Sequence, residues 1–285
     1  MKSGLYELSS YFRTRKFVAG VAKRIRGAGR CLLIYQMGRV ASQTINDTAK
    51  QALPGVPVVH VHWLSDKNLA SAIGRARGRY GFVRQRHLLV ARKIRALLDS
   101  EEGRSLDWLV ISVVRDPVAR NLSEYFLTLE EYHFKDAFKI YRDHPEQIDQ
   151  WVSYFVHEYD HLSRCRWFDE EIGEVLGVNV LDVPFDHERK FLLHEGRIKV
   201  LVLRQEDLET GLANGFQALT GVRPEQIARR HISSEDEHAG LYRALVERVK
   251  LPEVLLDRIY GCPWVRHFYG EDEIEVWRRK WRAGS

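Results

Sequence analysis

The sequence predicts an α/β protein in which a parallel β-sheet lies between two layers of helices. Two observations lead to this fold class: short apolar runs recur along the first half of the chain, and stretches of helical character separate them. Apolar runs without alternation are typical of parallel strands that are buried on both faces. Strands that alternate with helices favour crossover connections, which make a parallel sheet. With 285 residues, of which 45% are hydrophobic, the chain is long enough to bury a sizeable core.

The elements of the first half follow one another at the spacing of strand–helix units. A basic amphipathic segment at 6–26 ends at the sequence Gly27-Ala28-Gly29, so that residues 1–29 are predicted to form a basic helical extension. Strands are expected at 31–35, 56–63 and 108–114, with a helix at 43–52 and a long helical stretch before the third strand.

The second half predicts further helices and one β-hairpin. Residues 118–176 have a helical pattern rich in aromatic side chains, most of which should lie in the core. A β-like segment at 191–203 contains a turn at Glu195-Gly196, and helices separated by prolines follow from 208 onward. No internal repeat and no linker is visible, so the chain 1–285 is predicted to be a single domain.

The composition excludes several classes of protein. No run of about 18 apolar residues occurs, and the N-terminus lacks the apolar core of a cleaved signal. The three cysteines, Cys31, Cys165 and Cys262, are far apart and odd in number, which predicts neither a disulfide framework nor a metal site. We therefore expect a reducing, cytoplasmic setting.

Basic residues are concentrated in the first half of the chain. Residues 1–125 hold 22 Lys and Arg against 9 Asp and Glu, although the whole chain holds 44 against 39. Two windows, 8–46 and 67–98, contain eight and nine basic residues and no acid. Such a field attracts phosphates, sulfates, nucleic acid or acidic glycans, whereas a solvated helix face is the alternative for any single residue.

The loop after the first strand has the residue types of an anion-binding site. Gly38 lets a ligand approach the backbone, Arg39 supplies positive charge, and the N–H groups and hydroxyls at 42–44 open a helix. The GxxxxGK[ST] pattern of P-loop NTPases is absent, which counts against hydrolysis of ATP or GTP. A plain strand-to-helix turn is the alternative. The candidate ligand-binding residues are Gln36, Met37, Gly38, Arg39, Val40, Ala41, Ser42, Gln43 and Thr44.

A second anion-binding feature follows the third strand. Arg115 lies at the tip of a buried strand, where a charge needs a partner or a ligand. Pro117 suits the first turn of the next helix, and Ser123 can face the same ligand two turns further on. A salt bridge of Arg115 with Asp116 or Glu124 is the alternative. Ligands of open parallel sheets bind beyond the carboxyl ends of the strands, where both features are expected.

Together the two features resemble the sulfotransferases that use 3′-phosphoadenosine 5′-phosphosulfate (PAPS). Residues 36–44 resemble the 5′-phosphosulfate loop of this family, and Arg115 with Ser123 resembles its 3′-phosphate motif at the same eight-residue spacing. The resemblance implies a P-loop-like sulfotransferase fold with extra C-terminal helices. Residues 201–208 are similar to a strand-ending segment of the same sulfotransferases. From about residue 31 onward the chain is similar to bacterial capsular polysaccharide synthesis proteins, in the segments 167–172, 183–185, 264–269 and Trp281.

The resemblance implies in-line transfer of a sulfuryl group from PAPS to an acceptor hydroxyl or amine, with no metal required. Many family members have Lys where this chain has Arg39. Arginine keeps its charge, so Arg39 can neutralise the leaving phosphate but cannot also donate a proton. Arg229 and Arg230 lie where related enzymes close over the nucleotide; solvated charges at a helix end are the alternative.

His62 is the predicted general base, and His60 is the second choice. Both lie on one face of the strand beside the loop and can approach its carboxyl end. A satisfied structural histidine is the alternative in a chain with 12 histidines. Glu124, Asp169 and Glu206 are further candidates for the base.

The predicted acceptor is a glycan or an acidic polysaccharide. The basic segment 67–95 suits an acidic acceptor, and Trp63, Trp151, Trp167 and Phe168 are candidates for stacking on sugar rings. Under this interpretation nucleic acid is not a partner, whereas contact of the basic N-terminus with a membrane surface stays open. Two alternatives are a P-loop-like ATP-dependent sugar kinase with Asp116 as a magnesium ligand, and a non-catalytic protein that binds polyanions.

Overall fold

The computed structural model describes residues 2–80, 85–228 and 239–284. Contacts along the chain divide it into two compact units. The sheet unit comprises residues 1–37, 41–113 and 168–228, and the helical unit comprises residues 38–40, 114–167 and 229–285. The expectation of a single domain stays a prediction.

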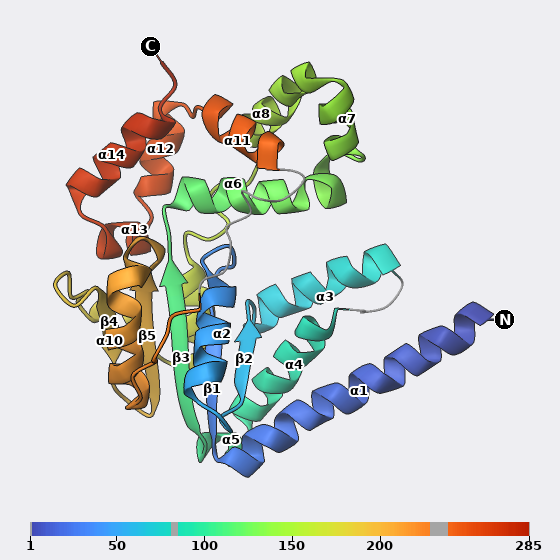
Figure 1. Ribbon diagram of the computed structural model, residues 1–285, viewed down its shortest axis with the longest axis vertical. Helices are drawn as coiled ribbons and strands as arrows, with labels where there is room; N and C mark the ends of the chain where they lie inside the picture. The colour runs from blue at the N-terminus through green and yellow to red at the C-terminus, as the bar shows by residue number, and fades with distance from the viewer. Residues whose placement is uncertain (1, 81–84, 229–238, 285) are drawn as a thin grey trace. The chain divides into compact units, whose positions relative to one another are not determined.

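The sheet unit is built on five strands in the order β2-β1-β3-β5-β4 (Figure 1). Strand β1 pairs in parallel with β2 on one side and with β3 on the other, so that Leu32 lies opposite Val58 and Leu109. The predicted α/β class is therefore confirmed. The strands are β1 (Arg30–Tyr35), β2 (Val58–Val61), β3 (Asp107–Val114), β4 (Phe191–His194) and β5 (Ile198–Arg204).

Both faces of the sheet are covered. All residues from 31 to 35 and from 108 to 114 are buried, and successive side chains of a strand point to opposite faces. Figure 1 shows α2 beside β1 and β2, and α10 beside β4 and β5. The helices of the sheet unit are α1 (Lys2–Ala28), α2 (Ser42–Ala52), α3 (Asp66–Tyr80), α4 (Arg86–Asp99), α5 (Glu101–Arg104), α9 (Glu174–Leu176) and α10 (Leu208–Thr220).

The sheet departs from the fully parallel prediction at one edge. Strand β4 runs antiparallel to β5, with Phe191 opposite Leu203 and His194 opposite Val200. Only residues 195–197 join the two strands, and a connection this short can link only antiparallel neighbours. The β-like segment predicted at 191–203, with its turn at Glu195-Gly196, is thus confirmed, and it forms a hairpin that adds an antiparallel edge strand to the sheet.

The helical unit begins where β3 ends. Pro117 is the first residue of α6 (Pro117–Thr128), as predicted, and the Asp116 carboxylate accepts a hydrogen bond from the Val118 N–H at 3.1 Å. This capping bond fixes the turn between strand and helix. The other helices of this unit are α7 (Ala137–Asp143), α8 (Ile148–His157), α11 (Ala239–Arg248), α12 (Glu253–Tyr260), α13 (Pro263–Phe268) and α14 (Glu271–Trp281).

The expectation that the cysteines form no disulfide is wrong. Cys165 and Cys262 are bonded, with 5.2 Å between their Cα atoms and a sequence separation of 97 residues. The reason is tertiary: the start of α13 folds back onto the segment after α8, where the Trp264 indole N–H donates to the Arg164 carbonyl at 3.1 Å. Cys31 is buried and not disulfide-bonded. Within the part of the chain described here, no helix has the length and apolarity needed to cross a membrane.

Candidate functional site

The order of the strands points to the ends of β1 and β3. From β1 the chain crosses to β2 on one side, and it later returns to β3 on the other side. Open α/β sheets bind ligands outside the carboxyl ends of the strands at such a reversal. The segments that leave these two strand ends carry Arg39 and Arg115, the two charged residues singled out in the sequence.

The loop after β1 has an unusual backbone. Gly38, Arg39 and Ala41 have positive φ angles of 85°, 61° and 59°. For a residue with a side chain this left-handed region costs about 1–2 kcal/mol, and strain of this kind clusters at functional sites. Ala41 precedes α2 and has no polar side chain that could cap this helix. The N–H groups of the first helical turn therefore receive no hydrogen bond from the capping residue, and such groups can bind an anion.

The first residue of this loop is a buried amide. Gln36 has no exposed surface, and neither polar atom of its side chain has a hydrogen-bond partner among the residues that the structure describes. Its backbone carbonyl accepts a hydrogen bond from His62 Nδ1 at 2.9 Å. Met37 and Val40 are buried and anchor the loop on either side of Gly38 and Arg39.

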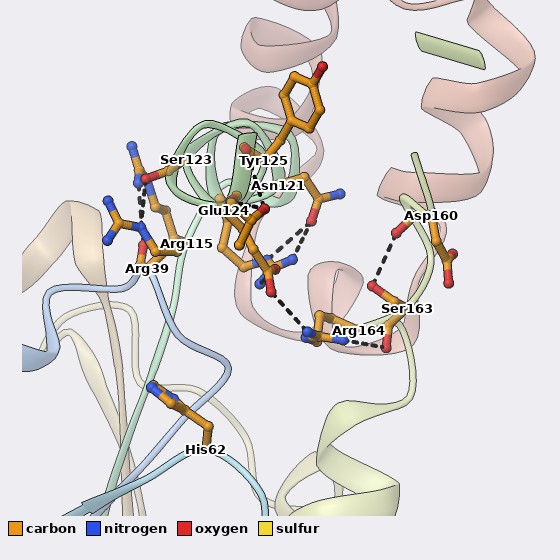
Figure 2. Close-up of polar contacts among 12 residues, drawn as sticks. Arg39, His62, Arg115, Asn121, Ser123, Glu124, Tyr125, Asp160, Ser163 and Arg164 are labelled. Carbon is orange, nitrogen blue, oxygen red and sulfur yellow. Dashed lines mark hydrogen bonds and ion pairs between the residues drawn. The ribbon is translucent and has the colours of Figure 1, made fainter. Parts of the chain in front are cut away.

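In the helical unit, Arg39 lies with both residues of the predicted 3′-phosphate motif (Figure 2). Its Nε donates to Ser123 Oγ at 3.0 Å, and its carbonyl accepts from Arg115 Nη1 at 3.3 Å. The residues come from the loop after β1, the tip of β3 and the second turn of α6. The fold therefore brings together two guanidinium groups and a hydroxyl that the sequence placed in separate motifs.

This cluster carries excess positive charge. Arg39 and Arg115 hydrogen-bond a hydroxyl and a carbonyl, and within the described parts of the chain neither forms an ion pair with a carboxylate. Burial is the main cause that lowers the pKa of Arg39; the charges of Arg115 and Arg120 also lower it, whereas those of Tyr242 and Glu124 raise it. The structure thus contradicts the alternative in which Arg115 forms a salt bridge with Asp116 or Glu124.

Glu124, whose charge acts on Arg39, is already engaged. It forms an ion pair with Arg120 at 2.7 Å and accepts a hydrogen bond from Arg164 at 3.0 Å, so it lies between two guanidinium groups. Figure 2 shows its contact with Arg164. A carboxylate held in this way is a weak proton acceptor, which argues against Glu124 as the general base. The other acidic candidates, Asp169 and Glu206, lie on exposed surface.

The two histidines of β2 differ in their surroundings. His62 must donate from Nδ1 to the Gln36 carbonyl, which leaves the lone pair of the neutral imidazole on Nε2. His60 and His62 contact each other edge to face, with 4.4 Å between ring centroids. Burial, followed by the charges of His62 and His87, lowers the pKa of His60 to about 3. A base with that pKa is poorly matched to neutral pH, so His62 is the better candidate.

The predicted acceptor-binding aromatics are mostly core residues. Trp167 and Phe168 are 1% and 3% exposed, so neither ring offers a face to a sugar. Trp151 is buried in α8 in the same way, whereas Trp63 is half-buried. Apolar burial explains these positions without a ligand. Arg229 and Arg230 lie outside the described residues.

Glu171 organises the segment after β2, a role that its sequence context does not predict. This fully buried carboxylate accepts hydrogen bonds from the backbone N–H groups of Leu64 and Ser65 at 2.7 and 2.9 Å. The Asn68 amide donates at 2.8 Å, and the Tyr35 and Ser65 hydroxyls donate as well. Glu171 thus fixes the segment that directly follows His62. The sequence does not predict its burial, because Glu171 follows two other acids, at 169 and 170, and a run of three acids is typical of a solvated face.

Asp116 is engaged by the C-terminal helices. In addition to Val118, it accepts from the Tyr260 hydroxyl at 3.0 Å and from the Trp281 indole N–H at 2.9 Å. Burial raises the pKa of Asp116. Such a carboxylate has little capacity left for a magnesium ion. Among the described residues, no group of three or more His, Cys, Asp or Glu side chains could hold a metal ion.

Comparison with models of known protein families gave no match, and comparisons with curated proteins and with solved structures gave none either. The candidate site therefore rests on the residues and geometry of this chain.

Proposed function

We propose that this chain is a sulfotransferase with a P-loop-like fold, which moves a sulfuryl group from PAPS to a hydroxyl or amine of a glycan. The observation that carries the proposal is the cluster of Arg39, Arg115 and Ser123, with bonds of 3.0 and 3.3 Å joining them. Guanidinium groups without a carboxylate partner favour a ligand with several anionic oxygens. PAPS has such oxygens at its 5′ and 3′ ends.

In the proposed mechanism the loop after β1 holds the 5′-phosphosulfate. Arg39 and the N–H groups of residues 40–44 stabilise the bridging oxygen as negative charge develops on it. Arg115 and Ser123 hold the 3′-phosphate, the group that distinguishes PAPS from ATP. Arg39 stays protonated throughout, so it acts through charge and hydrogen bonds alone.

His62 is proposed to take the proton of the acceptor. A new oxygen–sulfur bond forms as the bond between sulfur and the bridging phosphate oxygen breaks, and the proton of the acceptor passes to Nε2 of His62. The products are the sulfated acceptor and 3′-phosphoadenosine 5′-phosphate. As in phosphoryl transfer, positioning and charge stabilisation supply most of the rate.

Thermal unfolding with three nucleotides tests the donor. The purified protein is unfolded with 3′-phosphoadenosine 5′-phosphate, with 5′-AMP, and with ATP and Mg²⁺, at equal concentrations. A ligand at 100 times its Kd stabilises the protein by about 2.7 kcal/mol, which raises the Tm by several degrees. We expect a shift with the 3′-phosphorylated nucleotide alone.

Two variants locate that binding. Arg115→Ala should abolish the shift, whereas Arg258→Ala, an exposed arginine of α12, should preserve it. A shift with ATP and Mg²⁺ alone would replace the proposal with the kinase. No shift with any nucleotide would favour a protein that binds polyanions without catalysis.

A further inference from the structure

A pocket of about 560 Å³ lies along the edge strand of the sheet unit. Helices α1, α2 and α4 form it together with β2, and all four lie in this unit (Figure 1). Its polar lining includes Arg24, Lys50, His60, Arg86 and His87, and among the described residues no Asp or Glu lines it. The remaining wall is largely apolar. The pocket is therefore distinct from the arginine cluster of the helical unit.

The cations of this pocket differ from their neighbours. Arg26, two residues from Arg24 on the same helix, pairs with Glu102 at 2.7 Å. Arg95, on the same helix as Arg86, pairs with Asp99 at 2.9 Å. Arg24, Lys50 and Arg86 form no such ion pair within the described residues. Arg26 and Arg95 are thus paired with carboxylates, whereas the three cations that line the pocket have no ion pair among the described residues.

Two further features favour an anion there. Helix α4 begins at Arg86 with no acidic residue in its first turn, so its N-terminal end adds positive potential. His60 Nε2 is buried at the pocket and has no hydrogen-bond partner among the described side chains and backbone. A buried ring nitrogen of this kind is stabilised when a ligand hydrogen-bonds to it.

The pocket is adjacent to the proposed base. The His60 ring lines it and contacts the His62 ring, with 4.4 Å between centroids. A volume of about 560 Å³ lies within the range of small-molecule sites and fits one or two sugar rings. The apolar wall can contact the C–H faces of sugars. Within this wall the ring of Phe17 lies under the Arg86 guanidinium group, 5.6 Å from its centroid.

We propose that this pocket binds an acidic sugar unit of the acceptor, with Arg24, Lys50 and Arg86 holding its carboxylate or phosphate and His60 hydrogen-bonding to it. The assignment of this ligand as the acceptor rests on the proposed sulfotransferase function. The site itself rests only on the charges and geometry of the sheet unit.

Calorimetric titration tests the site without any nucleotide. The acidic probes are a hyaluronate tetrasaccharide, which carries carboxylates, and glucose 1-phosphate; the neutral control is the tetramer of N-acetylglucosamine. We expect at least one acidic probe to bind and the neutral tetramer to bind at least tenfold more weakly. The Arg24→Gln/Arg86→Gln variant should weaken acidic binding at least tenfold, whereas Arg26→Gln and Arg95→Gln together should change it less than twofold.

Three results would overturn the proposal. The first is an equal loss of affinity in both double variants, which would indicate unspecific electrostatic attraction. The second is that neither acidic probe binds. The third is that the protein binds only to phosphatidylcholine vesicles that contain phosphatidylglycerol. Unfolding with 3′-phosphoadenosine 5′-phosphate is measured on the same variants and reports the donor site separately. If that nucleotide fails to bind while the acidic sugar binds, the proposed function is lost and the sugar site stands.

Discussion

Arg39 donates a hydrogen bond from Nε to Ser123 Oγ across 3.0 Å, although 84 residues separate them in the sequence. Arg39 follows the first strand and Ser123 belongs to the helix after the third. The parallel pairing of β1 with β3 makes this contact understandable, because the carboxyl ends of parallel neighbours lie at one edge of the sheet.

Arg39 should contribute to turnover more than a single positive charge does. Its guanidinium group donates a hydrogen bond to Ser123, and its backbone carbonyl accepts a hydrogen bond from Arg115. We expect Arg39→Ala to reduce kcat/KM for PAPS at least about 100-fold, since removal of one stabilising donor typically costs this much. Arg39→Lys should recover part of the loss. Steady-state kinetics measures both, and unchanged kcat/KM in Arg39→Ala would remove this residue from the mechanism.

Glu171 should stabilise the protein far more than the acid beside it. The buried carboxylate accepts from two backbone N–H groups, two hydroxyls and an amide. In Glu171→Gln an amide group faces some of these donors, so we expect the free energy of unfolding to fall by at least about 3 kcal/mol. Glu170→Gln is the matched control and should cost less than about 1 kcal/mol, because its partner Lys67 is exposed. Urea unfolding distinguishes the two, and equal losses would contradict the prediction.

Asp116 should make stability depend on pH in an unusual direction. Burial raises its pKa in the folded state above that of an unfolded aspartate, so the folded protein binds more protons. Stability from this group is therefore present at low pH and declines as pH rises from about 4 toward the raised pKa. The difference in unfolding free energy between the wild type and Asp116→Asn should shrink over that range. A difference that grows with pH would show that the hydrogen bonds from Tyr260 and Trp281 outweigh burial.

The disulfide should stabilise the helical unit. Cys165 and Cys262 are 97 residues apart. Cross-linking a loop of this length lowers the conformational entropy of the unfolded chain, which stabilises the folded state by up to about 5 kcal/mol. We expect dithiothreitol to lower the Tm of the wild type but not that of the Cys165→Ala/Cys262→Ala variant. Alkylation after unfolding without reductant should label Cys31 alone. Labelling of all three thiols in freshly purified protein would contradict the bond.

The sequence predicted the parts of this fold that depend on local patterns. The apolar runs at 31–35 and 108–114 correspond to β1 and β3, and Pro117 opens α6 as expected. The predictions that failed depend on contacts between distant segments. Spacing along the chain does not reveal that Cys165 meets Cys262. Helical spacing likewise cannot tell whether an aromatic such as Trp167 lines a site or fills the core.

In the candidate site, too, the sequence predicts the features that depend on local patterns and misses those that depend on tertiary contacts. The motifs at Arg39 and Arg115 could be predicted because charged residues closely follow buried strands there, and Ser123 follows Arg115 at a fixed spacing. Glu171 was missed because its burial is tertiary, in a segment whose sequence predicts solvation. The pocket beside β2 could not be predicted either. Only the structure shows that Arg26 and Arg95 have acidic partners, whereas the cations of this pocket have no ion pair among the described residues.

His62 and His60 should separate in their effects on catalysis. His62 holds its lone pair on Nε2 because Nδ1 donates to Gln36, whereas His60 has a pKa lowered to about 3. We therefore expect His62→Ala to reduce kcat at least about 100-fold, within the usual range for a general base, with the affinity for 3′-phosphoadenosine 5′-phosphate unchanged. His60→Ala should act mainly on the KM of an acidic acceptor, because this ring lines the proposed sugar pocket. Single-turnover kinetics with saturating PAPS measures both effects, and full activity in the two variants would exclude histidine catalysis at this strand.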